Sequence, residues 1–363
     1  MRIAQIAPLY ESVPPRLYGG TERVVSYLTE ALIDLGHDVT LFASADSVTR
    51  ARLCSPCARA LRLGNDWTDP AIPHLLMLEQ VMREARNFDV VHSHLDYLHF
   101  PLARRVPMAF ITTLHGRLDL PDLGPLFQEF GDMPVVSVSH AQRRFLAAAN
   151  WVATVHHGLP EDMYTLQAAP GKYLAFLGRI SPEKRPDHAI EIARRTGYPL
   201  KIAAKVDRVD EEYFKVVVKP LLDDPQVEFV GEIDDKDKQG FLGNAYALLF
   251  PIEWPEPFGL VMIEAMACGT PVVAYRRGST PEIIDHGVTG FLVDDVDSAV
   301  RTVHRVGALD RKRIRESFNQ RFTARRMARD YVSAYMALRE IDLPPFKVAR
   351  ESGPSASLAA PEL

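Results

Sequence analysis

The segment from Glu256 to Ala274 constrains this chain more than any other. It reads Glu-Pro-Phe-Gly-Leu-Val-Met-Ile-Glu-Ala-Met-Ala-Cys-Gly-Thr-Pro-Val-Val-Ala. Its apolar spacing predicts a helix over 258–268, between an apolar run at 247–251 and a strand-like run at 271–274. In an open α/β sheet, ligands gather where helix N-termini face the carboxyl ends of strands, because free amides and the helix dipole favour anions there. The segment therefore predicts an anion site.

Two carboxylates straddle the start of this helix and are placed to bind different parts of one ligand. Glu256 lies just ahead of the helix, so its side chain reaches the hydroxyls of a neutral group beside the anion. The amides of Phe258, Gly259 and Leu260 face the anion. Leu260 and Glu264 are four residues apart and share a face, so Glu264 follows the ligand inward. A phosphate beside a polyhydroxyl group describes a sugar nucleotide.

Paired carboxylates also occur in glycoside hydrolases, where both flank one scissile bond at roughly 5–10 Å. Along a helix that rises about 1.5 Å per residue, Glu256 and Glu264 lie about 12 Å apart, too far to flank one bond. The pair therefore favours binding of an extended ligand.

The composition leaves room for two ordinary globular domains. The chain has 363 residues and a net charge of −5, which gives no general attraction to nucleic acid. It has no run of eighteen apolar residues and begins directly with a strand, so we expect neither a membrane span nor a signal peptide, and a cytoplasmic location. The cysteines are Cys54, Cys57 and Cys268. Because no second Cys-x-x-Cys follows, we expect no metal or redox role.

Strands and helices alternate twice along the chain, which predicts two Rossmann-like, doubly wound parallel-sheet domains of the α/β class facing each other across a cleft. The predicted strands lie near 2–7, 38–43, 89–93, 108–114, 134–138 and 152–155, then 173–177, 200–204, 227–230, 247–250, 271–274 and 291–293. Thr21 is expected to cap the first helix, which Gly36 ends. We expect domains at 1–165 and 166–322, and a disordered tail at 344–363.

The run from Glu256 resembles the donor-binding motif of retaining glycosyltransferases of the family-four type, also called glycosyl transferases group 1. That motif has the form E-P-F-G, a hydrophobic stretch, then E-A-M-A-x-G-x-P-V-V, and this chain matches it throughout. The resemblance implies the GT-B fold and a last helix, here 323–343, that packs back on the first domain. It also implies that Glu256 lies near the transferred sugar and Glu264 near the ribose.

Glycines and cations at two other strand-to-helix junctions suit a diphosphate. Gly19 and Gly20, in the run Tyr18-Gly-Gly-Thr-Glu, let the main chain approach a phosphate, although loop glycines are common and G-x-G-x-x-G is not present. Arg179 and Lys184 follow the first strand of the second half and supply a planar fork and a mobile charge. By resemblance, these glycines face the donor diphosphate and these cations hold the leaving group.

Histidines cluster at strand ends of the first half. His115 ends one strand and, by resemblance, contacts the transferred sugar. His94 and Asp96 are the acceptor-side candidates. His92 and His94 have a His-x-His spacing, but no carboxylate or cysteine set completes a metal site. The run 139–144 is either the rim of the cleft or a solvated helix start.

Other features carry weaker signals. By resemblance, the exposed main chain at Gly231 pairs with a base edge. Gly278 to Glu282 and Gly287 to Gly290 match later elements of the family and are expected to be mainly structural. Acidic turns at 234–237 and 294–297 are interpreted as solvated, and no metal is expected.

The hypothesis is a retaining, metal-independent hexosyltransferase without a cofactor, whose co-substrate is a nucleotide-diphosphate sugar, most simply UDP-glucose. The resemblance implies front-face attack, with the leaving phosphate taking the acceptor proton. A sugar-nucleotide epimerase or phosphorylase of the same fold, or a non-catalytic sensor, remains an alternative. The acceptor is a small molecule, a glycan or a lipid-linked sugar. Basic runs at 310–315 and 325–326 form either a peripheral membrane contact or a solvated helix face. The sequence does not identify the oligomeric state.

Overall fold

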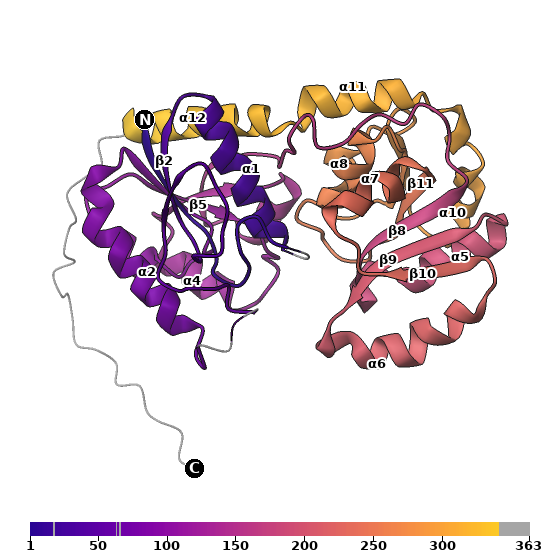
Figure 1. Ribbon diagram of the computed structural model, residues 1–363, viewed down its shortest axis with the longest axis horizontal. Coiled ribbons are helices and arrows are strands. Elements are labelled where there is room, and N and C mark those ends of the chain that lie inside the picture. The colour runs from indigo at the N-terminus through magenta and orange to yellow at the C-terminus, as the bar shows by residue number, and fades with distance from the viewer. Residues whose placement is uncertain (17–18, 63, 65–66, 341–363) are drawn as a thin grey trace, which may run out of the picture.

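The computed structural model describes residues 1–16, 19–62, 64 and 67–340. It has two lobes that lie side by side, each built around a parallel sheet (Figure 1). The predicted fold class, two Rossmann-like α/β domains of the GT-B type, is confirmed. Tyr18 and the expected tail at 344–363 lie outside the described residues.

The N-terminal sheet has seven strands in the order β3-β2-β1-β4-β5-β6-β7, and every neighbouring pair is parallel. Strands β1, β4 and β5 are buried on both faces, as expected for a sheet covered by helices. Its strands are β1 (Arg2–Ile6), β2 (Asp38–Phe42), β3 (Arg52–Cys54), β4 (Val90–Ser93), β5 (Phe110–Leu114), β6 (Pro134–Ser137) and β7 (Asn150–Thr154). Its helices are α1 (Gly20–Asp34), α2 (Ala71–Glu84), α3 (Phe100–Ala103) and α4 (Leu123–Glu129), with 3₁₀ turns η1 (Ala85–Asn87) and η2 (Ala141–Phe145).

The C-terminal sheet has six parallel strands in the order β10-β9-β8-β11-β12-β13. They are β8 (Tyr173–Ile180), β9 (Leu200–Val206), β10 (Val227–Gly231), β11 (Ala245–Phe250), β12 (Val272–Tyr275) and β13 (Gly290–Val293). The helices are α5 (Pro186–Thr196), α6 (Glu211–Tyr213), α7 (Asp235–Gly243), α8 (Leu260–Ala267), α9 (Thr280–Ile283), α10 (Val296–Val303) and α11 (Arg311–Arg321). Short turns of other helix types are η3 (Pro182–Lys184), η4 (Arg208–Asp210), η5 (Phe214–Val218), η6 (Lys219–Asp223) and η7 (Val306–Ala308).

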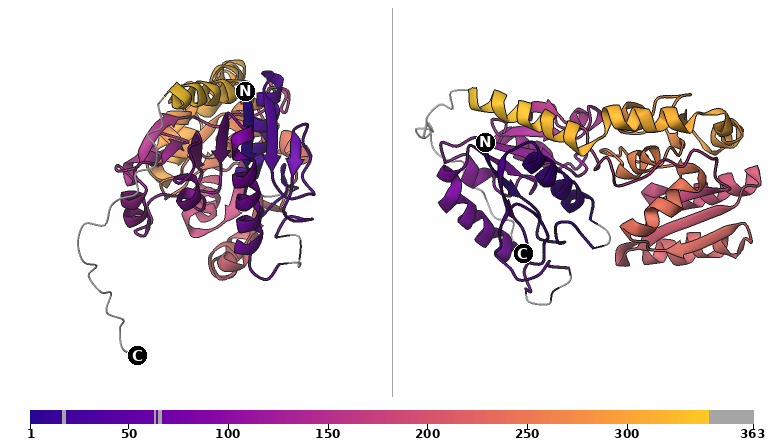
Figure 2. Two further views of the ribbon diagram at one scale, coloured as in Figure 1. Left: turned by 90° about the vertical axis from the view of Figure 1, so that its left-hand side faces the viewer. Right: turned by 45° about the horizontal axis from the view of Figure 1, so that its top comes forward.

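The last helix, α12 (Ala324–Glu340), returns to the first lobe. It continues from α11 across the top of the molecule and packs along α1, as two further views also show (Figure 2). Tyr331 and Tyr335 on its inner face are fully buried. One apolar cluster runs from these rings through Phe322 and Phe258 to α8, so the two lobes share part of their core.

Local details differ from the sequence-based expectations. Gly19, not Thr21, is the N-cap of α1, and no side chain caps that end. Gly36 has the predicted left-handed conformation, with φ of 84°. Cys54 ends the short edge strand β3, which the sequence did not predict, and pairs with Phe42 of β2.

Acidic turns predicted to be merely solvated have capping roles. Asp234 accepts the backbone N–H groups of Lys236 and Asp237 at the start of α7. Asp295 makes a capping box with Ser298 at the start of α10. Both satisfy amides that a helix start leaves without partners.

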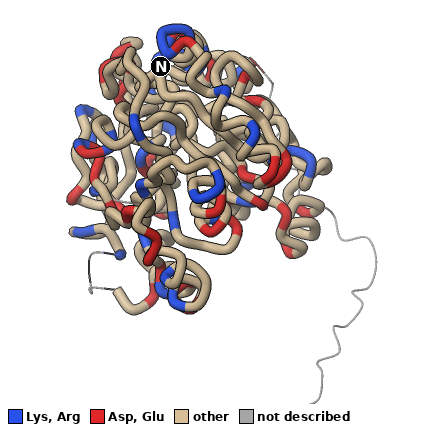
Figure 3. Tube along the Cα trace, turned by 90° about the vertical axis from the view of Figure 1, so that its right-hand side faces the viewer, with Lys and Arg blue, Asp and Glu red and all other residues tan. Residues whose placement is uncertain are grey.

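Two arginines of the basic runs have structural roles, although Lys312, Arg313 and Arg325 are exposed. Buried Arg311 donates to the carbonyls of Gln167, Ala245 and Gly243. Arg326 donates to two carbonyls of the interlobe connection, 2.8 and 2.9 Å away. Basic and acidic positions are interspersed along the chain (Figure 3). The interpretation of Arg311 and Arg326 as a solvated or membrane-facing patch is therefore wrong. In the part of the chain that the structure describes, no helix is both long and apolar enough to span a bilayer.

Candidate active site

A cavity of about 800 Å³ opens between the two lobes, at the carboxyl ends of both sheets. This is where an open parallel sheet binds ligands. The predicted residues, with one exception, line it together: Gly19, Gly20, His94, Asp96, His115, Arg179, Lys184, Glu256, Phe258, Gly259, Leu260 and Glu264. The exception is Gly231, which ends β10 with φ of 84° while its neighbours Glu232 and Ile233 form the wall.

Lys184 and Glu256 meet directly in the cavity wall. The ammonium of Lys184 forms an ion pair with Oε2 of Glu256, and only 14% and 12% of the two side chains are exposed. The indole N–H of Trp254 donates to the same carboxylate oxygen at 2.7 Å. Lys184 also lies 5.1 Å from the centre of the Trp254 ring, within cation–π range. Trp254 was not predicted, since nothing in the sequence marks it except its place two residues before Glu256.

The start of α8 carries the predicted anion-binding amides. Gly259 is its N-cap with φ of 84°, and a β-carbon there would lie 2.8 Å from Met262 and 3.0 Å from Phe250, so the position requires glycine. A β-carbon on Gly20, from the opposite lobe, would lie 3.9 Å from the Leu260 side chain. The glycine loop and the helix start therefore face each other across the cavity.

The helix begins four residues after Glu256. The predicted separation of about 12 Å between Glu256 and Glu264 assumed a continuous helix. Because residues 256–259 precede the helix, that prediction does not apply. The two carboxylates nevertheless have separate cation partners, Lys184 for Glu256 and Lys238 for Glu264, which favours separate roles over joint action on one bond.

Arg179 lies within β8, which is longer than the sequence indicated. Its guanidinium pairs with Glu183 at 3.1 Å, Asp207 at 3.5 Å and, more distantly, Asp210 at 3.9 Å. These carboxylates orient Arg179 and compete with any anion for it. A bound diphosphate has to replace part of this pairing.

Glu264 is held by a cation that the sequence analysis missed. Lys238 of α7 pairs with Oε1 of Glu264 at 3.0 Å and with Asp235 at 3.2 Å, and the Glu264 side chain is 4% exposed. Asp235 also forms an ion pair with Arg23 of the other lobe. Lys238 lies in the turn of α7 opposite α8, a proximity that only the folded chain reveals.

A chain of hydrogen bonds leads from the interior to His115. Nε2 of His94 lies 2.8 Å from Oε1 of Gln5, and Nδ1 of His94 lies 2.8 Å from Nε2 of His115. Behind them, Tyr335 of α12 contacts both Gln5 and His92. His92 therefore belongs to this network, not to a metal site.

The chain fixes which nitrogen of His115 carries a proton. Burial lowers the pKa of His115 to about 3 and holds the pKa of His94 well below its usual value, so both rings are neutral. The Gln5 oxygen can only accept, so Nε2 of His94 donates to it and Nδ1 of His94 accepts. Nε2 of His115 must then donate, which leaves Nδ1 of His115 as an acceptor.

Asp96 is held in an unusual conformation beside this chain. Two non-glycine residues among those described have positive φ, Asp96 at 50° and Arg185 at 52°, and Arg185 directly follows Lys184. Such strain concentrates at functional sites. Burial raises the pKa of Asp96 to about 6, although the backbone N–H of His115 donates to its carboxylate and lowers it.

The described residues contain no group of three or more His, Cys, Asp or Glu side chains arranged to hold a metal ion. Cys54, Cys57 and Cys268 are buried and unpaired by disulfides. Burial raises the pKa of Cys268 to about 12, so its thiol stays protonated.

Comparison with known families matches both halves of the chain. The family described as "Glycosyltransferase Family 4" matches residues 18–172, and the one described as "Glycosyl transferases group 1" matches residues 165–321. The two matches together span both lobes.

Individual relatives agree with these matches. A phosphatidyl-myo-inositol mannosyltransferase of Mycolicibacterium smegmatis is 27% identical over 355 residues, covering 90% of this chain and 89% of its own. The crystal structure of AviGT4, a glycosyltransferase involved in avilamycin A biosynthesis, has a TM-score of 0.74 at 24% identity, covering 94% of this chain and 98% of its own. Anabaena HepE, solved in complex with UDP and glucose, has a TM-score of 0.71 at 18% identity, covering 93% and 100%.

Proposed function

Because this chain belongs to the glycosyltransferases of the family-four type, with the GT-B fold, we propose that it is a retaining hexosyltransferase that uses a nucleotide-diphosphate sugar. The observation that carries the proposal is the direct contact of Lys184 and Glu256 in a cavity that also holds His115 from the opposite lobe. A cation for the leaving group thereby lies next to a carboxylate for the sugar.

The diphosphate is assigned to the cations and amides of the cavity. Lys184 and Arg179 supply positive charge, and the first amides of α8, which lack partners within the helix, supply hydrogen-bond donors. Gly19 and Gly20 let the main chain of the other lobe approach. This arrangement stabilises charge on the departing diphosphate without assigning that task to a metal ion.

The sugar is assigned to Glu256 and His115. Glu256 accepts hydrogen bonds from hexose hydroxyls, and Nδ1 of His115 accepts one from the opposite side. Glu264 binds the ribose through the carboxylate oxygen that Lys238 does not hold. The main chain near Gly231 is assigned to the base.

The reaction is front-face substitution at the anomeric carbon. The bond from this carbon to the diphosphate oxygen breaks, and a bond to the acceptor oxygen forms on the same face. The acceptor proton passes to the departing phosphate oxygen. A pKa of about 3 makes His115 a poor base near neutral pH, which supports this route. His94 and Asp96 are assigned to the acceptor side, and Asp96 accepts a hydrogen bond from a second hydroxyl of the acceptor, so that the proton of the attacking hydroxyl remains free for the departing phosphate.

UDP-glucose is the proposed donor. The support is the structural likeness to Anabaena HepE, whose complex contains UDP and glucose. A sugar-nucleotide epimerase or phosphorylase of the same fold, or a non-catalytic sensor, would bind its sugar ligand in the same cavity. Only a transferase releases nucleoside diphosphate in proportion to the acceptor glycosylated.

The test begins with a thermal-shift screen of UDP-, GDP- and ADP-sugars. A ligand at one hundred times its Kd adds about 2.7 kcal/mol to the free energy of unfolding. The stabilising donor is then incubated with candidate acceptors, and the anomeric configuration of the product is read by proton NMR. Retained configuration with stoichiometric nucleoside diphosphate supports the proposal. Inverted configuration, or epimerised donor without transfer, contradicts it.

A further inference from the structure

The turn formed by residues 279–282 is bonded to the loop that carries Glu256. The Ser279 amide donates to the carbonyl of Glu256 at 3.0 Å, and its hydroxyl donates to the carbonyl of Phe258 at 2.7 Å. Gly278, just before the turn, has φ of 51°, and a β-carbon there would lie 2.4 Å from the Glu256 carbonyl oxygen. The turn and the Glu256 loop are therefore held together.

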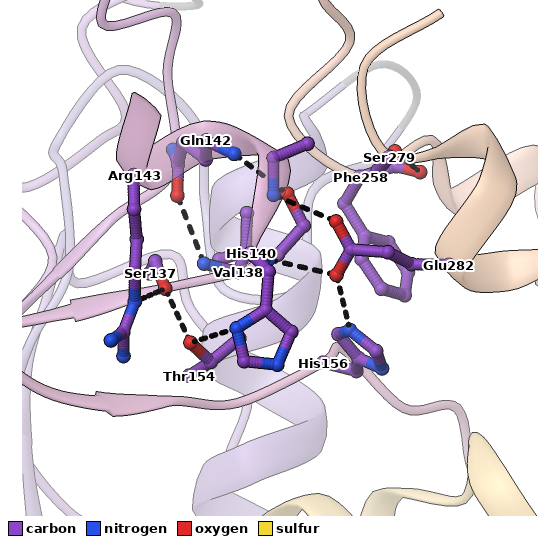
Figure 4. Close-up of polar contacts among 12 residues, drawn as sticks. Ser137, Val138, His140, Gln142, Arg143, Thr154, His156, Phe258, Ser279 and Glu282 are labelled. Atoms are coloured by element: carbon purple, nitrogen blue, oxygen red, sulfur yellow. Dashed lines mark hydrogen bonds and ion pairs between the residues drawn. The ribbon is translucent and has the colours of Figure 1, made fainter. Parts of the chain in front are cut away.

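Glu282, at the other end of this turn, reaches across to the N-terminal lobe (Figure 4). Its carboxylate accepts the backbone N–H groups of His140 and Ala141, each at 2.7 Å, at the start of η2. Nε2 of His156 lies 3.2 Å from the same group. Burial raises the pKa of Glu282, but these hydrogen bonds outweigh burial and the net pKa lies below its usual value. The carboxylate is therefore ionised and engaged.

Gln142, which follows Ala141 in the chain, connects this contact to the segment around His115. Its amide nitrogen donates to the carbonyls of Leu114 and Gly116, both at 2.9 Å, which are the carbonyls on either side of His115. Its oxygen accepts the amide of Val138 at 2.9 Å. Gln142 is 3% exposed, so water does not compete for these bonds.

We propose that the 279–282 turn and Gln142 form one hydrogen-bonded link that sets the position of His115 relative to Glu256, with Glu282 and Gln142 as positioning residues. Glu256 and His115 lie on different lobes, yet this link joins their backbones through a short series of contacts. The turn that the sequence indicated as mainly structural thereby acquires a role at the reaction centre.

The consequence for catalysis rests on the proposed function, in which these two residues hold the same hexose. Reacting groups tolerate little displacement, and a misplacement of about 1 Å costs about 100-fold in rate. A link between lobes therefore matters for turnover more than for nucleotide binding, because Lys184, Arg179 and α8 all belong to one lobe.

The link is tested by hydrogen–deuterium exchange with mass spectrometry on the full chain without ligand. In Glu282→Ala, the amides of His140 and Ala141 lose their acceptor, so exchange rises in peptides covering 138–146. The link predicts that exchange also rises in peptides covering 110–118, where the His115 amide reports its contact with Asp96. The matched control is Asp297→Ala, which removes an exposed carboxylate that pairs with Arg195 inside the same lobe. The control leaves both peptides as in the wild type.

Faster exchange at 138–146 without any change at 110–118 would overturn the proposal and leave a simple contact between lobes. If Glu282→Ala does not fold, Glu282→Gln keeps the side-chain size and one acceptor, and the same two peptides decide. Neither readout depends on the donor, so this test can fail while the proposed function holds, or the reverse.

Kinetics give an independent check once a donor is in hand. Glu282→Ala and Gln142→Leu each lower kcat about tenfold or more, while the Kd for UDP changes less than about twofold. Because both substitutions act through His115, the kcat of the double variant is no lower than that of the less active single variant. Multiplied losses in the double variant would contradict a single link.

Discussion

The two sides of the cavity handle polarity in opposite ways. On the C-terminal lobe, the wall consists of ion pairs: Lys184 with Glu256, Lys238 with Glu264, and Arg179 with Glu183. On the N-terminal lobe, burial keeps His94 and His115 neutral, and their hydrogen bonds lead into the core. One side is built to exchange charges with a ligand, and the other presents neutral histidines beside the carboxylate of Asp96.

This difference matches the two halves of the proposed reaction. A diphosphate carries several negative charges. Cations that already have carboxylate partners can exchange them for the diphosphate, and the pairing avoids the desolvation penalty of leaving unpaired cations buried in an apolar wall. The transferred sugar and the attacking hydroxyl are neutral, and hydroxyl groups need oriented partners. We therefore expect charge changes on the C-terminal side to produce the larger losses.

The largest effect is expected at the Lys184–Glu256 pair. Lys184→Ala and Glu256→Ala each lower kcat by about 10²- to 10³-fold, because each removes a charged group from the reaction centre. The measurement is nucleoside diphosphate release at saturating donor, with folding checked by circular dichroism. Lys201→Ala is the control, since Lys201 pairs with Glu228 on the surface of the same lobe. Full activity in either site variant would remove the assignment.

Arg179→Lys tests whether the geometry of the charge matters as well as its sign. The planar fork contacts several oxygens at once, and an ammonium cannot reproduce this. Loss of one charge-assisted hydrogen bond weakens UDP binding about tenfold, or about 1.4 kcal/mol. Isothermal titration calorimetry measures it. Unchanged affinity would mean that the acidic neighbours hold Arg179 away from the ligand.

On the opposite side, Asp96→Asn probes the acceptor. The pKa of Asp96 is raised to about 6, so the carboxylate is present above that pH and is lost as the pH falls through it. The wild type should lose kcat/KM for the acceptor below about pH 6. Asp96→Asn should be about fivefold slower at neutral pH, the effect of about 1 kcal/mol, and should lack this acidic limb. If Asp96→Asn still loses kcat/KM below about pH 6, the titration belongs to another group.

The smallest effect is expected from Gln5, which lies behind the site. Gln5→Leu removes the acceptor that fixes the His94 and His115 tautomers, and we expect about threefold lower kcat, as for one neutral hydrogen bond. Nitrogen-15 NMR of the histidine rings supplies the specific signature. In the wild type, His115 carries its proton on Nε2, and in the variant both tautomers are populated. A single unchanged tautomer would show that Gln5 does not set it.

The contrast between the two sides also explains what the sequence could reveal. The C-terminal side of the cavity, which is assigned to the donor, consists largely of two short runs of sequence, Glu256 to Glu264 and Arg179 to Lys184. Each run lies at a junction between a strand and a helix. Local patterns were therefore enough to predict the alternating elements, the fold and the donor-side residues that share the cavity.

Strand-end positions were enough to select His94, Asp96 and His115, but the network that holds them is assembled from distant parts of the chain, so no spacing revealed it. The Gln5–His94–His115 chain and its support by Tyr335 join residues that are 330 positions apart. The same holds for Glu282, whose partners His140 and Ala141 lie on the other lobe. Arg311 was interpreted from charge alone, and only packing shows that its donors bind buried carbonyls.

Titration of the wild type and Lys184→Ala with UDP, GDP and ADP is the most direct test of a cation-lined diphosphate site between the lobes. We predict that at least one nucleotide, with UDP favoured, binds the wild type and binds Lys184→Ala at least about tenfold more weakly, a difference of about 1.4 kcal/mol. Binding of none of the three, or equal binding by both proteins, would contradict it.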